Sequence, residues 1–284
     1  MFYLINKEKN ISSFKAIKTF AKKLKINKVG HTGTLDPMAT GLLLVATDDD
    51  TKLISYIENK IKAYVATIRF QYATDTFDAE GNITYTSNNL IQKDFIPKIL
   101  DWLLIQNFQI PPIYSAKKIN GIKSYELARK NKDVILTKQK IKVFDAKILD
   151  FNFEKQILKI YLKVSEGTYI RSLANDLAIQ FNTYGHLIAL DRVEIGSLNK
   201  NDIKNNNFSK IDITPLLKHE LFFANKKQIK SLKNGFEIDA KNYQEDVYFL
   251  VDKEDVNKTI LGIVESNKQK IKVKKLFGNR LKEY

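Results

Sequence analysis

The sequence contains no cysteine among its 284 residues, which excludes several kinds of chemistry. Disulfide bonds, zinc sites built on thiolates and a cysteine nucleophile all need the missing side chain. The three histidines, His31, His186 and His219, are dispersed along the chain, and their spacing is not that of a metal site. We therefore expect a protein that binds no metal.

Long apolar runs are missing as well. No stretch approaches the ~18 consecutive apolar residues that a membrane-spanning helix needs. The N-terminal residues 1–7 (MFYLINK) reach a charged side chain too early for a signal peptide. The sequence therefore predicts a cytoplasmic protein that is not attached to a membrane.

Acidic residues are scarce relative to basic ones. The chain has 47 Lys and Arg against 32 Asp and Glu, which gives a formal net charge of +15. A basic surface attracts polyanions because binding releases the counterions condensed on them. Nucleic acid is therefore the first candidate partner, although surplus lysine can also serve only to keep a surface soluble.

Apolar residues are plentiful enough for a buried core, since 44% of the chain is hydrophobic and 11% is aromatic. Their spacing predicts helices at 13–24, 51–61, 95–104, 124–130 and 170–178, and strands at 42–46, 63–70, 149–153, 158–164 and 186–195. Hairpins rather than regular strand-helix-strand units favour an α+β fold with a mixed, largely antiparallel sheet flanked by helices.

Two domains are expected from the length and from a change in pattern near residue 200. Residues 1–210 are expected to form a large domain, and the polar residues 199–207 are typical of a linker. Residues 218–284 carry short strand-like pieces and the basic run 268–275 (KQKIKVKK), which predicts a small β domain.

A glycine-rich loop precedes the first buried strand. Gly30, Gly33 and Gly41 fall within twelve residues, so the backbone there is expected to adopt positive φ angles or to approach a ligand closely. Asp36 lies in this loop and is followed by Pro37, which favours an extended aspartate and fixes the turn. An isolated Asp-Pro pair usually forms only an Asx-turn, so local spacing leaves both a structural and a catalytic interpretation of Asp36 open.

The whole loop, residues 30–43 (GHTGTLDPMATGLL), closely resembles the signature of the TruB family of tRNA pseudouridine synthases. Four further blocks resemble that family in the same order. These blocks are residues 62–66 (KAYVA), 111–118 (PPIYSAKK) with Gly121, Tyr125, Ala128 and Arg129, 167–171 (GTYIR), and 187–192 (LIALDR). Two family motifs are altered, at residues 7–10 (KEKN) and 48–52 (DDDTK), and these changes concern loop shape rather than chemistry.

The resemblance implies a pseudouridine-synthase-like catalytic domain in residues 1–210 and a PUA-like RNA-binding domain in residues 218–284. The implied catalytic residue is Asp36. The implied substrate-binding residues are His31, Tyr64, Arg171, Leu190 and Lys52. The resemblance also implies that the enzyme is a monomer that acts on uridine 55 in the T-arm of tRNA, flips that base out of the stack and uses no cofactor.

The residue types suit that reaction. Pseudouridine forms when the C1′–N1 bond of uridine breaks, the uracil turns, and C5 bonds to C1′; a carboxylate can stabilise or capture the resulting ribose cation. An arginine such as Arg171 would keep Asp36 ionised, and the ring of Tyr64 would hold the detached uracil by stacking. The hydroxyl of Tyr64 could also remove the C5 proton. The sequence leaves open whether Asp36 attacks C1′ or assists loss of a 2′ proton through a glycal-like intermediate.

Three other functions compete with this hypothesis. A uridine C5-methyltransferase would need a cysteine nucleophile, which the chain lacks. A base-excising glycosylase could use the same aspartate but would release free uracil. A tRNA-binding protein that had lost the chemistry would not need Asp36, Tyr64 and Arg171 together.

Overall fold

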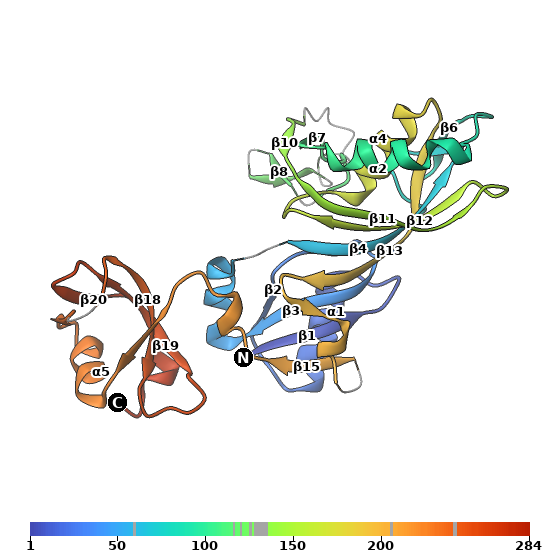
Figure 1. Ribbon diagram of the computed structural model, residues 1–284. Helices are drawn as coiled ribbons and strands as arrows, with labels where there is room; N and C mark the ends of the chain where they lie inside the picture. Colours follow the sequence, from blue (N-terminus) through green and yellow to red (C-terminus); the bar gives the residue numbers. More distant parts are fainter. Residues whose placement is uncertain are drawn as a thin grey trace. The chain divides into compact units, whose positions relative to one another are not determined.

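The computed structural model describes residues 1–58, 61–115, 117–119, 121–124, 127, 136–204, 207–240 and 243–284. The chain forms two compact units (Figure 1). The first consists of Met1–Thr47 and Asn59–Ile211, and the second of Asp48–Glu58 and Asp212–Tyr284. The first unit ends one residue beyond the predicted large domain, but residues 48–58, which the sequence placed in that domain, belong to the second unit.

The first unit is built on a nine-stranded sheet with the order β11-β12-β4-β13-β3-β1-β15, in which β2 also pairs with β3 and β14 with β13. Its strands are β1 (Phe2–Lys7), β2 (Val29–His31), β3 (Thr40–Thr47), β4 (Lys62–Phe70), β11 (Val143–Asn152), β12 (Ile157–Val164), β13 (Gly185–Ile195), β14 (Leu198–Asn199) and β15 (Phe208–Ile211). Only β13 and β3 pair in parallel, whereas all other pairs are antiparallel. The predicted mixed, largely antiparallel sheet is confirmed.

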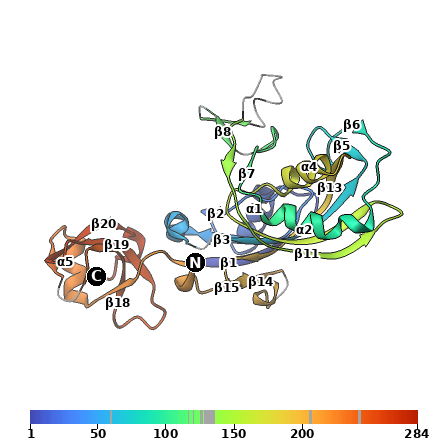
Figure 2. The same ribbon diagram turned by 45° about the horizontal axis from the view of Figure 1, so that its top comes forward.

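Among the described residues of this unit, helices α1 (Ser13–Lys23), α2 (Ile96–Leu104) and α4 (Ile170–Gln180) pack against the sheet. Helices α2 and α4 lie on the same side of β11 and β12 (Figure 1), and α4 runs along β13 (Figure 2). They cover the largest apolar core, which includes Ile99 and Leu173 from the helices and Ile68 from β4. A smaller core lies between α1 and strands β1 and β3.

Apolar spacing predicted these helices well but erred at individual positions. The stripe expected in residues 170–178 is buried, as are Ile17 and Phe20 of α1. Helical spacing in residues 13–24 also predicts that Phe14 faces the core, but Phe14 is 65% exposed and Ser13 is buried instead. Leu149 is exposed because the pairing of β11 with β12 shifts register beside it, which turns its side chain away from the core.

Several short elements complete the first unit. The paired strands are β5 (Tyr72–Thr74) with β6 (Ile83–Thr86), β7 (Phe108–Gln109) with β10 (Gln139–Lys140), and β8 (Lys118–Ile119) with β9 (Ile122–Lys123). The predicted linker 199–207 contains the end of β14 and a 3-10 turn, η3 (Lys200–Asp202), before β15 rejoins the sheet. Most of the predicted helix 124–130 lies outside the described residues, as do Ala116, Tyr125, Ala128 and Arg129.

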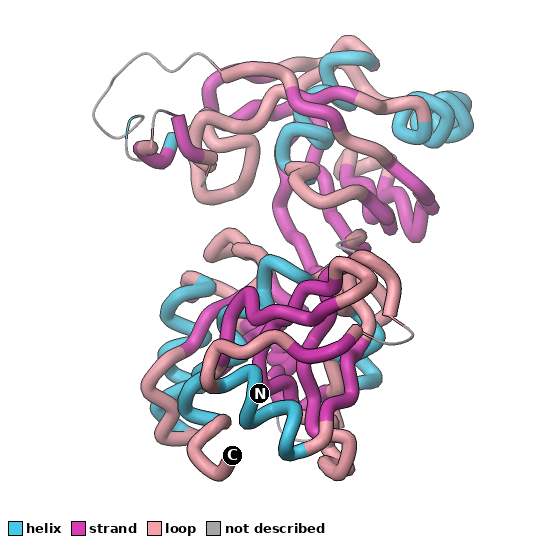
Figure 3. The backbone as a smooth tube through the Cα atoms, turned by 90° about the vertical axis from the view of Figure 1, so that its left-hand side faces the viewer, coloured by secondary structure: helices cyan, strands magenta, loops and turns pink. Residues whose placement is uncertain are grey.

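The second unit is a five-stranded sheet with one helix. The order is β16-β18-β19-β20-β17, made of β16 (Leu221–Ala224), β17 (Ile238–Asp239), β18 (Asp246–Asp252), β19 (Ile260–Ser266) and β20 (Lys270–Leu276), and the helix is α5 (Lys226–Lys233). In both units strands (magenta in Figure 3) form the scaffold and the helices (cyan) are short. The expected small β domain is therefore present in the C-terminal part of the chain.

Residues 48–58 are built into this second unit. The predicted helix 51–61 is instead a 3-10 helix, η1 (Asp48–Tyr56). The Arg280 guanidinium donates to Asp50 Oδ2 at 2.7 Å, and the ring of Tyr56 packs edge-on against Phe249. The backbone N–H of Lys218 also donates to the backbone oxygen of Tyr56, at 2.9 Å. Within the described part of the chain, no helix is long and apolar enough to cross a membrane.

Candidate active site

A cavity of about 360 Å³ opens in the first unit, between the loop that joins β2 to β3, the start of α4, and strands β4 and β13. Its lining residues are Thr32, Gly33, Thr34, Leu35, Asp36, Lys62, Tyr64, Ser115, Lys117, Gln139, Ser165, Glu166, Gly167, Thr168, Tyr169, Ile170, Arg171, Leu190 and Arg192. Four of the six predicted site residues, Asp36, Tyr64, Arg171 and Leu190, line this cavity, whereas His31 and Lys52 do not.

The loop that carries Asp36 needs its last glycine. Gly41 has a φ of +102°, and a Cβ at this position would lie 2.3 Å from the backbone oxygen of Arg192. Any larger residue would force the loop away from β13. Gly33 has no positive φ, but a Cβ there would press on the ammonium of Lys62 at 3.2 Å. Gly41 thus shows the positive φ expected of this loop, whereas the close neighbour of Gly33 is a side chain of the protein and not a ligand.

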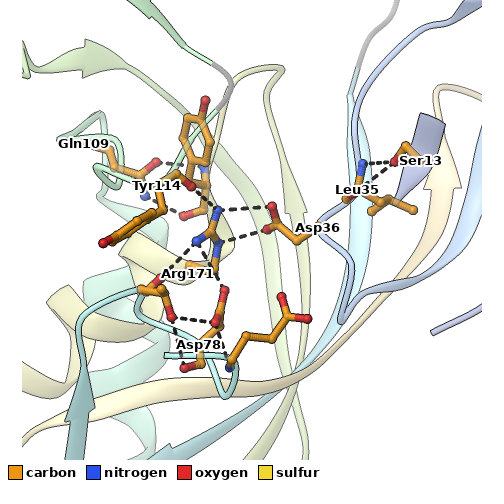
Figure 4. Close-up of polar contacts among 10 residues, drawn as sticks. Ser13, Leu35, Asp36, Asp78, Gln109, Tyr114 and Arg171 are labelled. Carbon is orange, nitrogen blue, oxygen red and sulfur yellow. Dashed lines mark hydrogen bonds and ion pairs between the residues drawn. The ribbon is translucent and has the colours of Figure 1, made fainter. Parts of the chain in front are cut away.

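Asp36 and Arg171, which are distant in the sequence, meet in this cavity (Figure 4). Arg171 Nη2 donates to Asp36 Oδ1 at 3.1 Å. Arg171 Nε lies 2.9 Å from Asp36 Oδ2, which is an ion-pair contact rather than a hydrogen bond. Both carboxylate oxygens therefore face the guanidinium, in the side-by-side arrangement that orients a carboxylate.

A second carboxylate, Asp78, shares the same guanidinium. Its Oδ2 lies 3.2 Å from Arg171 Nη1, and its Oδ1 accepts hydrogen bonds from the hydroxyl of Thr76 and the backbone N–H of Glu80. Arg171 also donates to the backbone oxygens of Thr76, at 3.0 Å, and Tyr114, at 2.9 Å. The buried arginine is thus held by two carboxylates and two carbonyls.

Sequence reasoning missed Asp78. Residues 73–81 (ATDTFDAEG) have the polar composition of a loop, and the three acidic residues there, Asp75, Asp78 and Glu80, give no reason to single out one of them. In the structure Asp78 is 3% exposed, whereas Asp75 and Glu80 are exposed. The usable signal was a dense acidic loop directly after the strand that carries Tyr64.

The electrostatics of Asp36 are set by opposing effects. Burial raises the pKa of Asp36 above its ordinary value, Arg171 lowers it, and the neighbouring charge of Asp78 raises it again, so that the net direction is upward. Although 33% of the Asp36 side-chain surface is exposed, Asp36 lines the cavity, where surrounding protein replaces most of the bulk water. Arg171 therefore opposes the effect of burial and favours the ionised form of the Asp36 carboxylate.

Tyr64 and Leu190 form an apolar wall of the cavity. They lie on the adjacent strands β4 and β13, and both belong to the main core, together with Leu35 from the Asp36 loop. Their side chains are buried, with exposures of 7% for Tyr64 and 6% for Leu190. An aromatic ring beside a leucine can hold a planar base by stacking and by dispersion.

Cationic side chains line the cavity beside this wall. Arg192 is buried and donates from Nε to the backbone oxygen of Leu42, at 2.7 Å, and from Nη2 to that of Gly33, at 3.1 Å. Lys117 donates to Gln139 Oε1 at 3.2 Å. A basic lining of this kind suits a substrate that carries phosphates. In the described part of the chain, no three His, Asp or Glu side chains are grouped as metal ligands would be.

The two remaining predicted residues lie outside the cavity lining. His31 lies on β2, directly before the lining residue Thr32, and burial together with Arg192 lowers the pKa of its imidazole, so that it is neutral at neutral pH. Lys52 belongs to the second unit, where its ammonium lies 2.6 Å from Asp49 Oδ1 and 4.8 Å from the ring centre of Phe277. Roles for His31 and Lys52 in substrate binding stay predictions.

Comparison with known proteins agrees with this geometry. The sequence model of the TruB family of pseudouridylate synthases (N-terminal domain) matches residues 21–170. The chain is 39% identical over 284 residues to the tRNA pseudouridine synthase B of Mycoplasma mobile, covering 100% of this chain and 96% of that protein. It is 41% identical over 283 residues to the tRNA pseudouridine synthase B of Mycoplasmopsis pulmonis, covering 100% and 97%. The chain belongs to the TruB family of pseudouridylate synthases.

Solved structures share the fold. A chain of a Cbf5-Nop10-Gar1 complex superposes with a TM-score of 0.64 at 17% sequence identity, covering 96% of this chain and 84% of that one. A chain of an H/ACA RNP bound to a substrate RNA containing 2′-deoxyuridine gives a TM-score of 0.63 at 15% identity, covering 97% and 84%. The pseudouridine-synthase-like α+β fold expected from the sequence is confirmed, and the protein is an enzyme of this class.

Proposed function

We propose that this enzyme converts uridine 55 in the T-arm of tRNA to pseudouridine, with Asp36 as its catalytic carboxylate. The observation that carries the proposal is the paired contact of Asp36 with Arg171 in a cavity that also contains Tyr64 and Leu190. The names of the two relatives, both tRNA pseudouridine synthases, support tRNA as the substrate.

The proposed reaction starts at the glycosidic bond. Asp36 attacks C1′ of the ribose as the C1′–N1 bond breaks, and the electron pair of that bond leaves with the uracil. The uracil then turns, C5 bonds to C1′ as the carboxylate is released, and C5 loses its proton while N1 gains one. Because atoms and electrons balance within the substrate, we propose that no cofactor takes part.

Each wall of the cavity has a task in this scheme. Arg171 keeps Asp36 ionised and fixes the direction of its two oxygens. Tyr64 and Leu190, which both line the cavity, would hold the detached uracil against escape, and the hydroxyl of Tyr64 would take the C5 proton. Exclusion of water by this wall favours transfer back to C1′ over hydrolysis, which distinguishes the proposal from a glycosylase.

The uridine must leave its stack to enter the cavity. We propose that the T-arm base flips out and that His31, next to the lining residue Thr32, fills the space it leaves. Lys117 and Arg192 would contact the flipped nucleotide and its phosphates. The second unit would act as a PUA-like RNA-binding domain, with Lys52 among its RNA contacts, and the enzyme would work as a monomer.

A tritium-release assay tests this function. Purified protein is incubated with an unmodified tRNA transcript labelled with tritium at uridine C5, and the labelled water is counted. We expect release with the normal transcript and none from position 55 when uridine 55 is replaced by cytidine. Release that is unchanged by this replacement would contradict the assignment of position 55, and free uracil in the products would contradict the isomerase in favour of a glycosylase.

A further inference from the structure

Two side chains that do not line the cavity form pairs of hydrogen bonds with the backbone next to Asp36 and near Arg171. The first is Ser13, the buried first residue of α1. Its hydroxyl accepts a hydrogen bond from the backbone N–H of Leu35, at 2.8 Å, and donates to the backbone oxygen of the same residue, at 2.9 Å. Leu35 directly precedes Asp36, so this side chain fixes the backbone from which the carboxylate projects (Figure 4).

The second is Gln109 on β7, which is 3% exposed. Its Oε1 accepts from the backbone N–H of Tyr169, at 2.8 Å, and its Nε2 donates to the backbone oxygen of Tyr169, at 2.9 Å. Tyr169 is the N-cap residue of α4 and lies two residues before Arg171. The side chain of Tyr169 makes no capping hydrogen bond, so Gln109 supplies contacts that this helix start does not provide for itself.

We propose that Ser13 and Gln109 are positioning residues that set the geometry of the Asp36–Arg171 pair by occupying both backbone hydrogen-bonding groups of a neighbouring residue. Neither side chain lines the cavity. The proposal rests on the function proposed for Asp36. Together the two contacts hold the loop between β2 and β3 on the Asp36 side of the pair and the start of α4 on the Arg171 side.

Other backbone contacts also hold the segments on either side of the Asp36–Arg171 pair. The backbone oxygen of Pro37, on the other side of Asp36, accepts from the backbone N–H of Asn10 at 2.8 Å. The backbone oxygen of Tyr114, five residues after Gln109, accepts from Arg171 Nη2 at 2.9 Å. The segment that holds the start of α4 therefore also holds the far end of the arginine. Reactive groups in enzymes need such support, because a misplacement of ~1 Å can cost ~100-fold in rate.

Loss of either contact should have a specific electrostatic signature. Arg171 opposes the effect of burial on the pKa of Asp36. If the guanidinium moves away from the carboxylate, the pKa of Asp36 should rise further. The other charged groups that act on Asp36, or on Glu80 and Lys7 beside it, include Asp78, Glu80, Lys7 and Arg192, and none of them is changed by substitution of Ser13 or Gln109. The acid limb of the pH–rate profile should therefore move to higher pH.

The test uses Gln109→Met and Ser13→Ala with matched controls in the full-length chain. Gln156 offers the control for Gln109, because it is also buried and also hydrogen-bonds to both backbone groups of one residue. Its Oε1 accepts from Ile91 N at 2.7 Å and its Nε2 donates to Ile91 O at 3.2 Å. Neither Gln156 nor Ile91 lines the cavity. Ser12 offers the control for Ser13, because Ser12→Ala removes the N-cap of the same helix, where Ser12 accepts from Lys15 N.

Single-turnover rates on tRNA, tRNA affinity and thermal stability are measured across the acid pH range. We expect Gln109→Met and Ser13→Ala to slow the rate about tenfold or more, with unchanged tRNA affinity and an acid limb at higher pH. Gln156→Met and Ser12→Ala should lower the thermal stability but leave the single-turnover rate and the position of the acid limb unchanged.

Three results would overturn the proposal. Equal rate losses in test and control variants, or a rate loss without movement of the acid limb, would show that Ser13 and Gln109 contribute only stability. Normal rates in both test variants would show that the pair needs no such support. If Gln109→Met does not fold, Ser13→Ala against Ser12→Ala decides alone. Failure of the proposed function is distinguishable, because the unsubstituted chain would then form no pseudouridine.

Discussion

Replacement of Arg171 by methionine should leave two carboxylates facing each other without the cation that contacts both. Arg171 Nε lies 2.9 Å from Asp36 Oδ2, and Nη1 lies 3.2 Å from Asp78 Oδ2. Methionine keeps much of the volume of the buried side chain but supplies neither charge nor a donor. The substitution therefore isolates the electrostatic part of the loss.

The expected cost at neutral pH is large. Removing one partner of a buried ion pair costs about 3–5 kcal/mol because the other charge stays buried and uncompensated. Asp78, with a side chain that is 4% exposed, should bear most of this cost. Asp36, which is 33% exposed at the cavity wall, can be partly rehydrated. We expect Arg171→Met to lower the free energy of unfolding of the first unit by about 3 kcal/mol.

The sign of the pH dependence follows from the direction of the pKa shifts. Without Arg171, burial and the charge of Asp78 hold the pKa of Asp36 above that of the unfolded chain. Folding is then penalised at a pH above the raised folded-state pKa of Asp36, and the penalty disappears as the pH falls below its unfolded-state pKa. Each additional proton bound by the folded state corresponds to about 1.4 kcal/mol per pH unit in this window.

Urea unfolding followed by tryptophan fluorescence measures this effect. The single tryptophan, Trp102, lies on α2 and packs against the core of the first unit, so it reports on the unit that contains the cavity. The double variant Arg171→Met/Asp78→Asn should regain part of the lost stability. A deficit of equal size at neutral and acid pH, with no gain in the double variant, would refute the reasoning.

Three further predictions concern other parts of the molecule. Tyr64→Phe should keep tRNA affinity but slow tritium release, whereas Tyr64→Ala should weaken both, since only phenylalanine preserves the stacking ring; filter binding and tritium counting separate them. Burial lowers the pKa of Lys7 to about 8, and its ammonium donates to the backbone oxygen of Pro37. Activity should therefore fall as the pH rises through about 8, because the ammonium loses its charge. The pH–rate profile of Lys7→Met should show no such step. A chain that ends at Ile211 should be cut by trypsin at Lys52 faster than the full chain, because residues 48–58 lose their partners in the second unit.

Much of the fold was predictable because the signals were local. The buried stripe of α4 and the alternation in β4 follow from side-chain spacing within single elements, and the structure contains both. The errors also have local causes. A register shift near Leu149 and the inward turn of Ser13 depend on contacts with other segments, which apolar spacing does not encode.

The candidate site divides in the same way. The position of Asp36 in a distinctive motif singled it out, and the structure places it beside Arg171, Tyr64 and Leu190 in one cavity. Asp78 was missed because an acidic loop gives no sign of which carboxylate will be buried. Gln109 was missed because its two hydrogen bonds go to the backbone of a segment 60 residues away, which leaves no pattern in the sequence.

The most direct test of the catalytic role of Asp36 compares the unsubstituted enzyme with Asp36→Asn in a single-turnover tritium-release assay. Asparagine has nearly the same size and can still accept a hydrogen bond from Arg171 Nη2, so tRNA affinity should be retained. We predict release by the unsubstituted enzyme and a loss of at least ~1,000-fold in Asp36→Asn, which corresponds to about 4 kcal/mol in the barrier. Unchanged release by Asp36→Asn would contradict the catalytic role of Asp36.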